Sequence, residues 1–218
     1  MLQISKRVSA LSPSATLAML QKTNELKAAG VDVIGLTAGE PDFNTPDHIK
    51  DAAKKAIDEN YSRYTPVSGY LSLRKAICDK LQRENGLTFT PDQIVVGNGA
   101  KHELANVVLT MVNPGDEVII PTPAWVSYVE LVKLAEGVPV CVPALPENGL
   151  KLTAEQLEAA ITPRTRLMIL CTPSNPTGAV YTAEELEALA AVLVKHPDVT
   201  VLSDEIYEPV SYTHLTLP

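Results

Sequence analysis

Segments with the apolar spacing of amphipathic helices alternate along most of the chain with short segments that are apolar almost throughout. The short segments have the length and composition of buried strands. We predict strands over residues 31–36, 93–97, 117–120, 138–142, 166–171 and 199–203. We predict helices over residues 14–29, 45–60, 71–84, 100–112 and 124–135, and two further helices that begin after Thr153 and Thr182.

Several helix ends carry local signals. Thr45 followed by Pro46 predicts an N-cap with proline in the first turn, and Asn85-Gly86 predicts the end of the preceding helix. In a capping box, a Thr hydroxyl and a Glu or Gln three residues later each bind the other's backbone N–H. We predict capping boxes at Thr153 with Gln156 and at Thr182 with Glu185.

Apolar strands that alternate with helices predict an α/β fold, in which a mainly parallel sheet has helices on both faces. Such sheets bind their cofactors beyond the carboxyl ends of the strands. The loops that follow Gly97, Ile120, Cys171 and Ser203 are therefore the places where we expect the chemistry.

Composition and charge narrow the function classes. The 218 residues are 45% hydrophobic and 20% charged, as in an ordinary globular protein. The net charge of -8 argues against a surface for nucleic acid or an anionic membrane. No apolar segment has the length of a membrane span, and the first residues do not resemble a signal peptide, so we expect a cytoplasmic location.

Among the loops where we expect the chemistry, the one after Gly97 contains small residues and the one after Ile120 contains an aromatic side chain. The loop over 96–102 is rich in glycine at a predicted strand-to-helix junction, where backbone N–H groups and the helix dipole attract a phosphate. Tight-turn glycines are the alternative. Trp125 follows the next strand and could be a platform for a flat ligand or a core residue.

The loops after Cys171 and Ser203 contain polar side chains whose positions the neighbouring backbone restricts. Asn175 stands between prolines, which restrict its backbone, although Asn-Pro also occurs in plain turns. Asp204 ends a buried strand, where a carboxylate needs a cationic or hydrogen-bonding partner, although it could also cap a helix. Tyr207 could present its phenol to the same ligand.

Together the residues of these four loops predict a binding site for a flat, phosphorylated heteroaromatic molecule with a basic ring nitrogen. Pyridoxal 5′-phosphate (PLP) has these properties. An acid at its ring nitrogen keeps the ring protonated, and the protonated ring withdraws electrons from the substrate carbanion.

The same loops and several further motifs resemble the fold-type-I PLP-dependent aminotransferases. The resemblance is closest to the aspartate aminotransferases of class I, subgroup 1b, and it covers about residues 4–209 in family order. The matching motifs are Pro13-Ser14-Ala15-Thr16, residues 36–43, Tyr64-Thr65-Pro66-Val67-Ser68-Gly69, residues 114–118, Trp125-Val126-Ser127-Tyr128, Ser174-Asn175-Pro176-Thr177-Gly178 and residues 203–208.

The resemblance implies roles toward the cofactor. Asp204 would pair with the ring nitrogen, Trp125 would stack on the ring, and Asn175 and Tyr207 would bind the 3′-oxygen. The backbone amides that would hold the phosphate are those of Gly99, Ala100 and Lys101.

The resemblance also implies substrate contacts and a homodimer. The N–H of Gly39 would meet the substrate α-carboxylate, and Trp125 and Asn175 would also border the substrate. Lys101 could meet the distal carboxylate of a dicarboxylic substrate, with a solvated lysine as the alternative. Tyr64 would reach the phosphate of the neighbouring subunit.

By the same resemblance, residues 1–44 would form an N-terminal arm and a small-domain segment, and 45–210 part of a PLP-binding large domain. Residues 211–218 do not fit the family pattern and are expected to be a non-native tail. No lysine stands in the Ser-Lys context, followed by Gly-x-Arg, of the family's Schiff-base lysine. The chain is therefore expected to be an N-terminal fragment without activity of its own.

The expected parent activity is transamination of an L-amino acid, with aspartate and 2-oxoglutarate as the favoured pair. One alternative is an aminotransferase for aromatic amino acids or prephenate. Ser12 lowers the prephenate option, because some prephenate enzymes carry a basic residue there. A second alternative is a PLP-binding module without catalysis.

Overall fold

A computed structural model of the chain describes residues 4–36, 39, 41 and 43–210. These residues divide into two units, one made of 4–18 and 100–210 and the other of described residues within 19–99. The expected division into 1–44 and 45–210 stays a prediction, and the expected tail over 211–218 lies outside the described residues.

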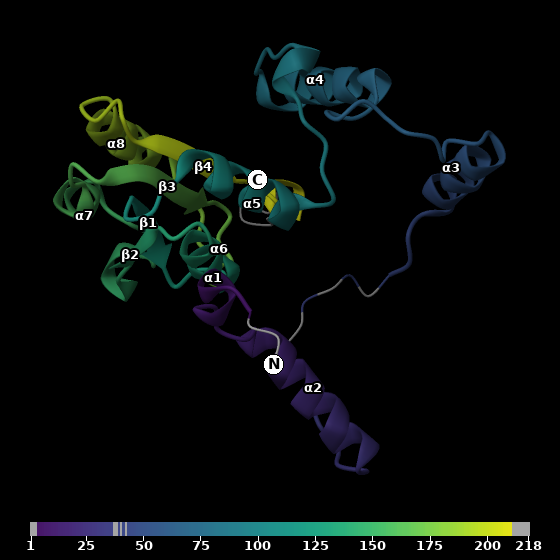
Figure 1. The fold of residues 1–218 in the computed structure, drawn as a ribbon, viewed down its shortest axis with the longest axis horizontal. Coiled ribbons are helices and arrows are strands. Elements are labelled where there is room, and N and C mark those ends of the chain that lie inside the picture. The colour runs from purple at the N-terminus through teal and green to yellow at the C-terminus, as the bar shows by residue number, and fades with distance from the viewer. Residues whose placement is uncertain (1–3, 37–38, 40, 42, 211–218) are drawn as a thin grey trace, which may run out of the picture. The chain divides into compact units, whose positions relative to one another are not determined.

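The first unit is built on a parallel sheet, as the alternating pattern predicts (Figure 1). Within the described residues its strand order is β2-β1-β3-β4, and each neighbouring pair is parallel. The strands are β1 (Glu117–Thr122), β2 (Val138–Pro143), β3 (Thr165–Cys171) and β4 (Thr200–Asp204). The predicted α/β class is therefore confirmed.

Helices cover both faces of this sheet because alternate strand residues point to opposite sides. In β1, Val118 and Ile120 pack into the cluster that contains α5 and α6, whereas Ile119 packs into the cluster that contains α7 and α8. All three are fully buried. These helices are α5 (Ala100–Met111), α6 (Ser127–Leu134), α7 (Ala154–Ala160) and α8 (Ala183–Leu193).

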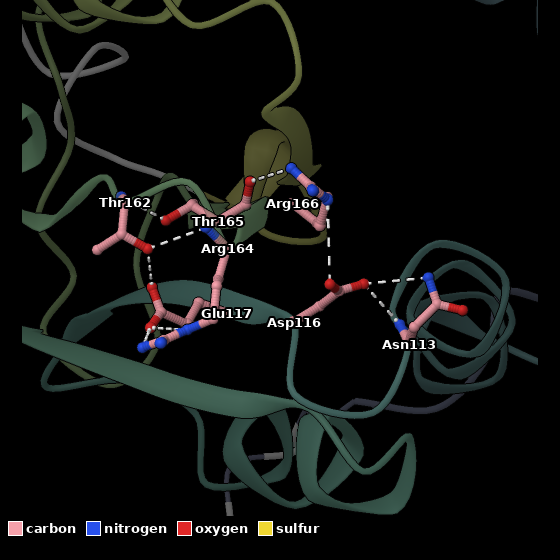
Figure 2. A network of polar contacts seen from close by, with 7 residues as sticks. All are labelled: Asn113, Asp116, Glu117, Thr162, Arg164, Thr165 and Arg166. Carbon is pink, nitrogen blue, oxygen red and sulfur yellow. Dashed lines mark hydrogen bonds and ion pairs between the residues drawn. The ribbon is translucent and has the colours of Figure 1, made fainter.

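A polar network ties the amino-terminal ends of β1 and β3 together (Figure 2). The buried Glu117 carboxylate accepts hydrogen bonds from the Thr162 hydroxyl at 2.5 Å and from Arg164 Nε at 2.9 Å. Beside it, Asp116 accepts a hydrogen bond from the Asn113 backbone N–H at 2.8 Å. The network lies at the end of the strands opposite to their carboxyl ends, so it supports the fold and leaves the other edge to ligands.

Short elements complete the described chain. The first unit contains α1 (Lys6–Ser9) and the 3₁₀ turns Pro146–Asn148 and Glu208–Val210. The helix α2 (Ala15–Ala28) begins in the first unit and continues into the second. The second unit also contains α3 (Asp47–Asp58), α4 (Leu71–Asn85) and the 3₁₀ turn Pro91–Gln93. Among the described residues, no helix combines the length and the apolar character needed to cross a bilayer.

The predicted helix ends agree with the structure in most places. Both capping boxes are present, and Gly86 ends α4 in the left-handed region with φ of 68°. Thr45 does not cap α3, because Pro46 occupies the N-cap position and no side chain bonds to the first turn. The helix predicted from residue 124 begins at Ser127, since the preceding strand extends to Thr122 and a loop intervenes.

Two predicted strands, over 31–36 and 93–97, are wrong. Neither segment pairs with another strand among the described residues. Ile34 and Leu36 are 85% and 89% exposed, and residue 93 belongs to a 3₁₀ turn. Apolar composition alone does not make a strand, because a strand also needs a neighbour that satisfies its backbone groups.

Candidate functional site

The carboxyl ends of β1, β3 and β4 lie along one edge of the sheet, because these neighbouring strands run parallel. Three of the four loops expected to carry the chemistry follow these strand ends. The structure therefore places the loops of Trp125, Asn175 and Asp204 at one edge, as predicted.

Asp204 is the last residue of β4 and is only 7% exposed. Its Oδ2 accepts a hydrogen bond from the Tyr128 hydroxyl at 2.6 Å, and its Oδ1 accepts one from the Ile206 N–H at 3.2 Å. In the part of the chain that the structure describes, no ion pair includes Asp204. The carboxylate is thus held in place by neutral donors, and it can receive a cationic group from a ligand.

Tyr128 is a site residue that sequence reasoning missed. It lies in the first turn of α6, is 2% exposed, and its ring meets the Trp125 ring edge-on at 5.5 Å between centroids. Burial, and then the hydrogen bond to Asp204, raise the pKa of the Tyr128 phenol well above its usual range, so the phenol stays a donor. The sequence signal was its place in the Trp125-Val126-Ser127-Tyr128 motif, three residues after the platform.

Lys101 and Trp125 form a second contact at this edge. The Lys101 ammonium lies 4.7 Å from the centre of the Trp125 ring, within the range of a cation–π interaction. Ala100 and Lys101 are the first two residues of α5, where backbone N–H groups have no partner inside the helix. This helix start therefore offers both amide donors and a positive charge beside the aromatic platform.

Asn175 and Tyr207 meet across two loops. The Asn175 side-chain amide donates a hydrogen bond to the Tyr207 hydroxyl at 2.9 Å. Asn175 follows β3, and Tyr207 follows β4. Both side chains keep contact with solvent, so a ligand oxygen could bind to the pair.

Gly39, Tyr64 and Gly99 belong to the other unit, so their positions with respect to these side chains stay predictions. Gly99 has φ of 86°, a left-handed conformation that favours glycine. The Tyr64 side chain is fully exposed, which leaves its hydroxyl available for a contact outside its own unit.

The residues present fit PLP on structural grounds. The buried Asp204 carboxylate has no cationic partner among the described residues, and a protonated ring nitrogen would supply one. Trp125 offers an aromatic face, and the Asn175–Tyr207 pair offers polar groups from the adjacent loops. The start of α5 offers amides for a phosphate.

Comparisons with known proteins also indicate an aminotransferase. A family model described as "Aminotransferase class I and II" matches residues 31–217. The aspartate/prephenate aminotransferase of Cereibacter sphaeroides is 57% identical over 205 residues, which are 94% of this chain and 51% of that protein. The aspartate aminotransferase of Geobacillus stearothermophilus is 56% identical over 97% of this chain and 53% of that protein.

A solved structure shows the same likeness. The aspartate aminotransferase from Thermus thermophilus with maleate has a TM-score of 0.91 and 49% sequence identity. The match covers 95% of this chain and 54% of the solved one. The chain thus spans about half the length of the curated relatives that it matches.

Proposed function

Because this chain belongs to the class I and II aminotransferase family, we propose that the whole protein transfers an amino group from an L-amino acid to a 2-oxo acid with PLP as its cofactor. The observation that carries the proposal is the Asp204 carboxylate, which is buried at the sheet edge with neutral donors only. Such a group is costly without a cation, and a protonated pyridine nitrogen is a cation of suitable shape.

When bound, PLP supplies an electron-withdrawing ring that stabilises negative charge at the substrate α-carbon. Asp204 would keep the proton on the ring nitrogen, and Trp125 would hold the ring plane. Asn175 and Tyr207 would donate hydrogen bonds to the ring's 3′-oxygen, which orients the ring. The amides of Gly99, Ala100 and Lys101 would anchor the phosphate.

Aspartate and 2-oxoglutarate are the favoured substrates. Two relatives that are more than half identical have aspartate in their names, one as an aspartate aminotransferase and the other as an aspartate/prephenate aminotransferase. Lys101 would meet the distal carboxylate of these dicarboxylic substrates, and the Gly39 N–H would meet the α-carboxylate. The ammonium of Lys101 already lies at the aromatic platform, which supports this assignment.

Prephenate is the second candidate acceptor, because the relative from Cereibacter sphaeroides is named an aspartate/prephenate aminotransferase. Ser12 argues against it, since its side chain carries no charge for prephenate, whereas some prephenate enzymes have a basic residue there. An aromatic amino acid remains an alternative donor. A PLP-binding module without catalysis is disfavoured by membership of an enzyme family.

The whole protein would be a cytoplasmic homodimer in which Tyr64 of one subunit reaches the phosphate site of the other. The covalent lysine would lie in the part of the relatives' length that this chain does not span. For that reason we expect the 218 residues alone to catalyse no amino transfer.

The direct test is an assay of glutamate formation from aspartate and 2-oxoglutarate by the full-length protein. Replacing Asp204 with Ala should lower the rate by about a hundredfold or more, as removal of a preorganised charge does. The control is Asp198→Ala, an exposed acid before the amino end of the same strand, which should leave the rate unchanged. The proposal fails if the native protein shows no transfer, or if the Asp204 variant keeps the native rate.

A further inference from the structure

Tyr128 links the acid and the aromatic platform of the site with a single side chain. Its hydroxyl donates to Asp204 Oδ2 at 2.6 Å, and its ring edge contacts Trp125. The two partners come from different loops, one after β1 and one at the end of β4. A displacement of Tyr128 would therefore disturb both.

The hydroxyl and its carboxylate partner are both shielded from solvent. Tyr128 is 2% exposed, and Asp204 is 7% exposed. Ile206 donates its backbone N–H to the other carboxylate oxygen, so each oxygen of Asp204 has one fixed donor from the protein. Each oxygen keeps a second lone pair for a ligand.

The hydrogen bond from Tyr128 affects the negative charge of the Asp204 carboxylate as well as its position. A donor to a carboxylate stabilises the ionised form over the protonated form. The phenol remains a donor throughout the physiological range, because burial raises the pKa of Tyr128. If a ring nitrogen and Asp204 share one proton, this donor favours the arrangement in which nitrogen holds the proton and Asp204 stays an anion.

We propose that Tyr128 is a positioning residue that aims the Asp204 carboxylate at the ring nitrogen of bound PLP and, by its hydrogen bond to that carboxylate, favours the proton on the nitrogen. This inference rests on the proposed function, since it concerns the same cofactor. It assigns to Tyr128 an effect on the cofactor's protonation that packing against Trp125 alone would not produce.

The test uses the full-length protein loaded with PLP that carries nitrogen-15 in its ring. The nitrogen-15 resonance reports directly whether the ring nitrogen is protonated. Tyr128→Phe keeps the ring against Trp125 and removes only the hydroxyl. The resonance should move from the position of a protonated ring toward that of an unprotonated ring, because the carboxylate loses the hydrogen-bond donor that stabilises its negative charge.

The matched control is Tyr181→Phe. Tyr181 is also buried, and its hydroxyl accepts a hydrogen bond from the Leu152 N–H at 2.7 Å in the other core cluster. The variant loses one buried hydrogen bond without touching Asp204, so its resonance should stay at the native position. An equal movement in both variants would show general loosening and would overturn the proposal.

The remaining outcomes are also decisive. An unmoved resonance in folded Tyr128→Phe protein overturns the inference and leaves the proposed function standing, whereas a native protein that binds no PLP overturns both. If Tyr128→Phe does not fold, 3-fluorotyrosine at position 128 preserves the shape and strengthens the donor. The resonance should then stay at the position of a protonated ring, and a movement toward the unprotonated position would refute the role.

Discussion

The positive charge of Lys101 is the feature of single residues that bears most directly on substrate choice. Its ammonium lies over the Trp125 ring, 4.7 Å from the ring centre, where the ring face attracts the cation. A carboxylate that arrives at this platform would find a charge already in place. A monocarboxylic substrate would gain nothing from it.

We therefore expect Lys101→Ala, in the full-length protein, to raise the KM for aspartate about tenfold or more and to change the KM for alanine little. Lys133→Ala is a suitable control, because Lys133 pairs with Glu130 at 2.9 Å on α6. Steady-state assays with both amino acids make the comparison. Equal changes for aspartate and alanine would rule out a contact with the distal carboxylate.

Single residues also show which contacts could be predicted from the sequence and which could not. Asp204 and Asn175 could be assigned to one edge, because parallel strands bring their carboxyl ends together. Tyr128 could not be assigned, since its hydrogen bond to Asp204 joins residues 76 positions apart, and only packing decides which phenol reaches a buried acid. The contact of Lys101 with Trp125 depends on packing in the same way.

At the scale of elements, the polar network at the amino ends of β1 and β3 should govern how the fold responds to acid (Figure 2). The hydrogen bond from Thr162, and then that from Arg164, lower the pKa of Glu117 below its ordinary value. A carboxyl whose folded pKa is lowered stabilises the fold above its unfolded pKa. That contribution is lost as the pH falls through the folded pKa.

Glu117→Gln should accordingly destabilise the full-length protein at neutral pH, and the difference from the native protein should shrink below about pH 4.3, the ordinary glutamate value. Denaturant unfolding at a series of pH values measures this difference. Parallel stability curves for the two proteins across the acid range would show that the network does not hold Glu117 ionised.

The elements differ in how far sequence predicts them. The longer helices and β1–β4 were predictable, because their signals are local: capping boxes, the Gly86 end, and apolar runs, which lie buried on both faces in β1 and β3. The segments over 31–36 and 93–97 carry similar apolar runs but find no strand neighbour among the described residues. Strand pairing depends on the assembled sheet, so an apolar run by itself does not identify a strand.

At the scale of the whole molecule, the described sheet has an open edge along β4. Within the described residues, β4 pairs only with β3, so one of its edges is open, and Val201 on it is 41% exposed. An open edge of this kind favours pairing with further chain. The chain spans about half of its relatives, and we expect the other half to cover this edge.

Family membership was predictable at this scale because many separate motifs follow one another in family order. The positions of Gly39, Tyr64 and Gly99 with respect to Asp204 stay predictions, because those residues belong to the other unit. Substrate choice is expected to depend on still fewer residues, and Lys101 is the one that we propose for it.

The central claim is that Asp204 is the charged partner of a bound pyridine ring. Its most direct measurement is the dissociation constant of pyridoxamine phosphate from the full-length protein, because this form of the cofactor binds without a covalent link. Asp204→Ala should weaken binding by about tenfold or more, as loss of a hydrogen-bonded charge does. An unchanged dissociation constant would contradict the assignment of this sheet edge as the cofactor site.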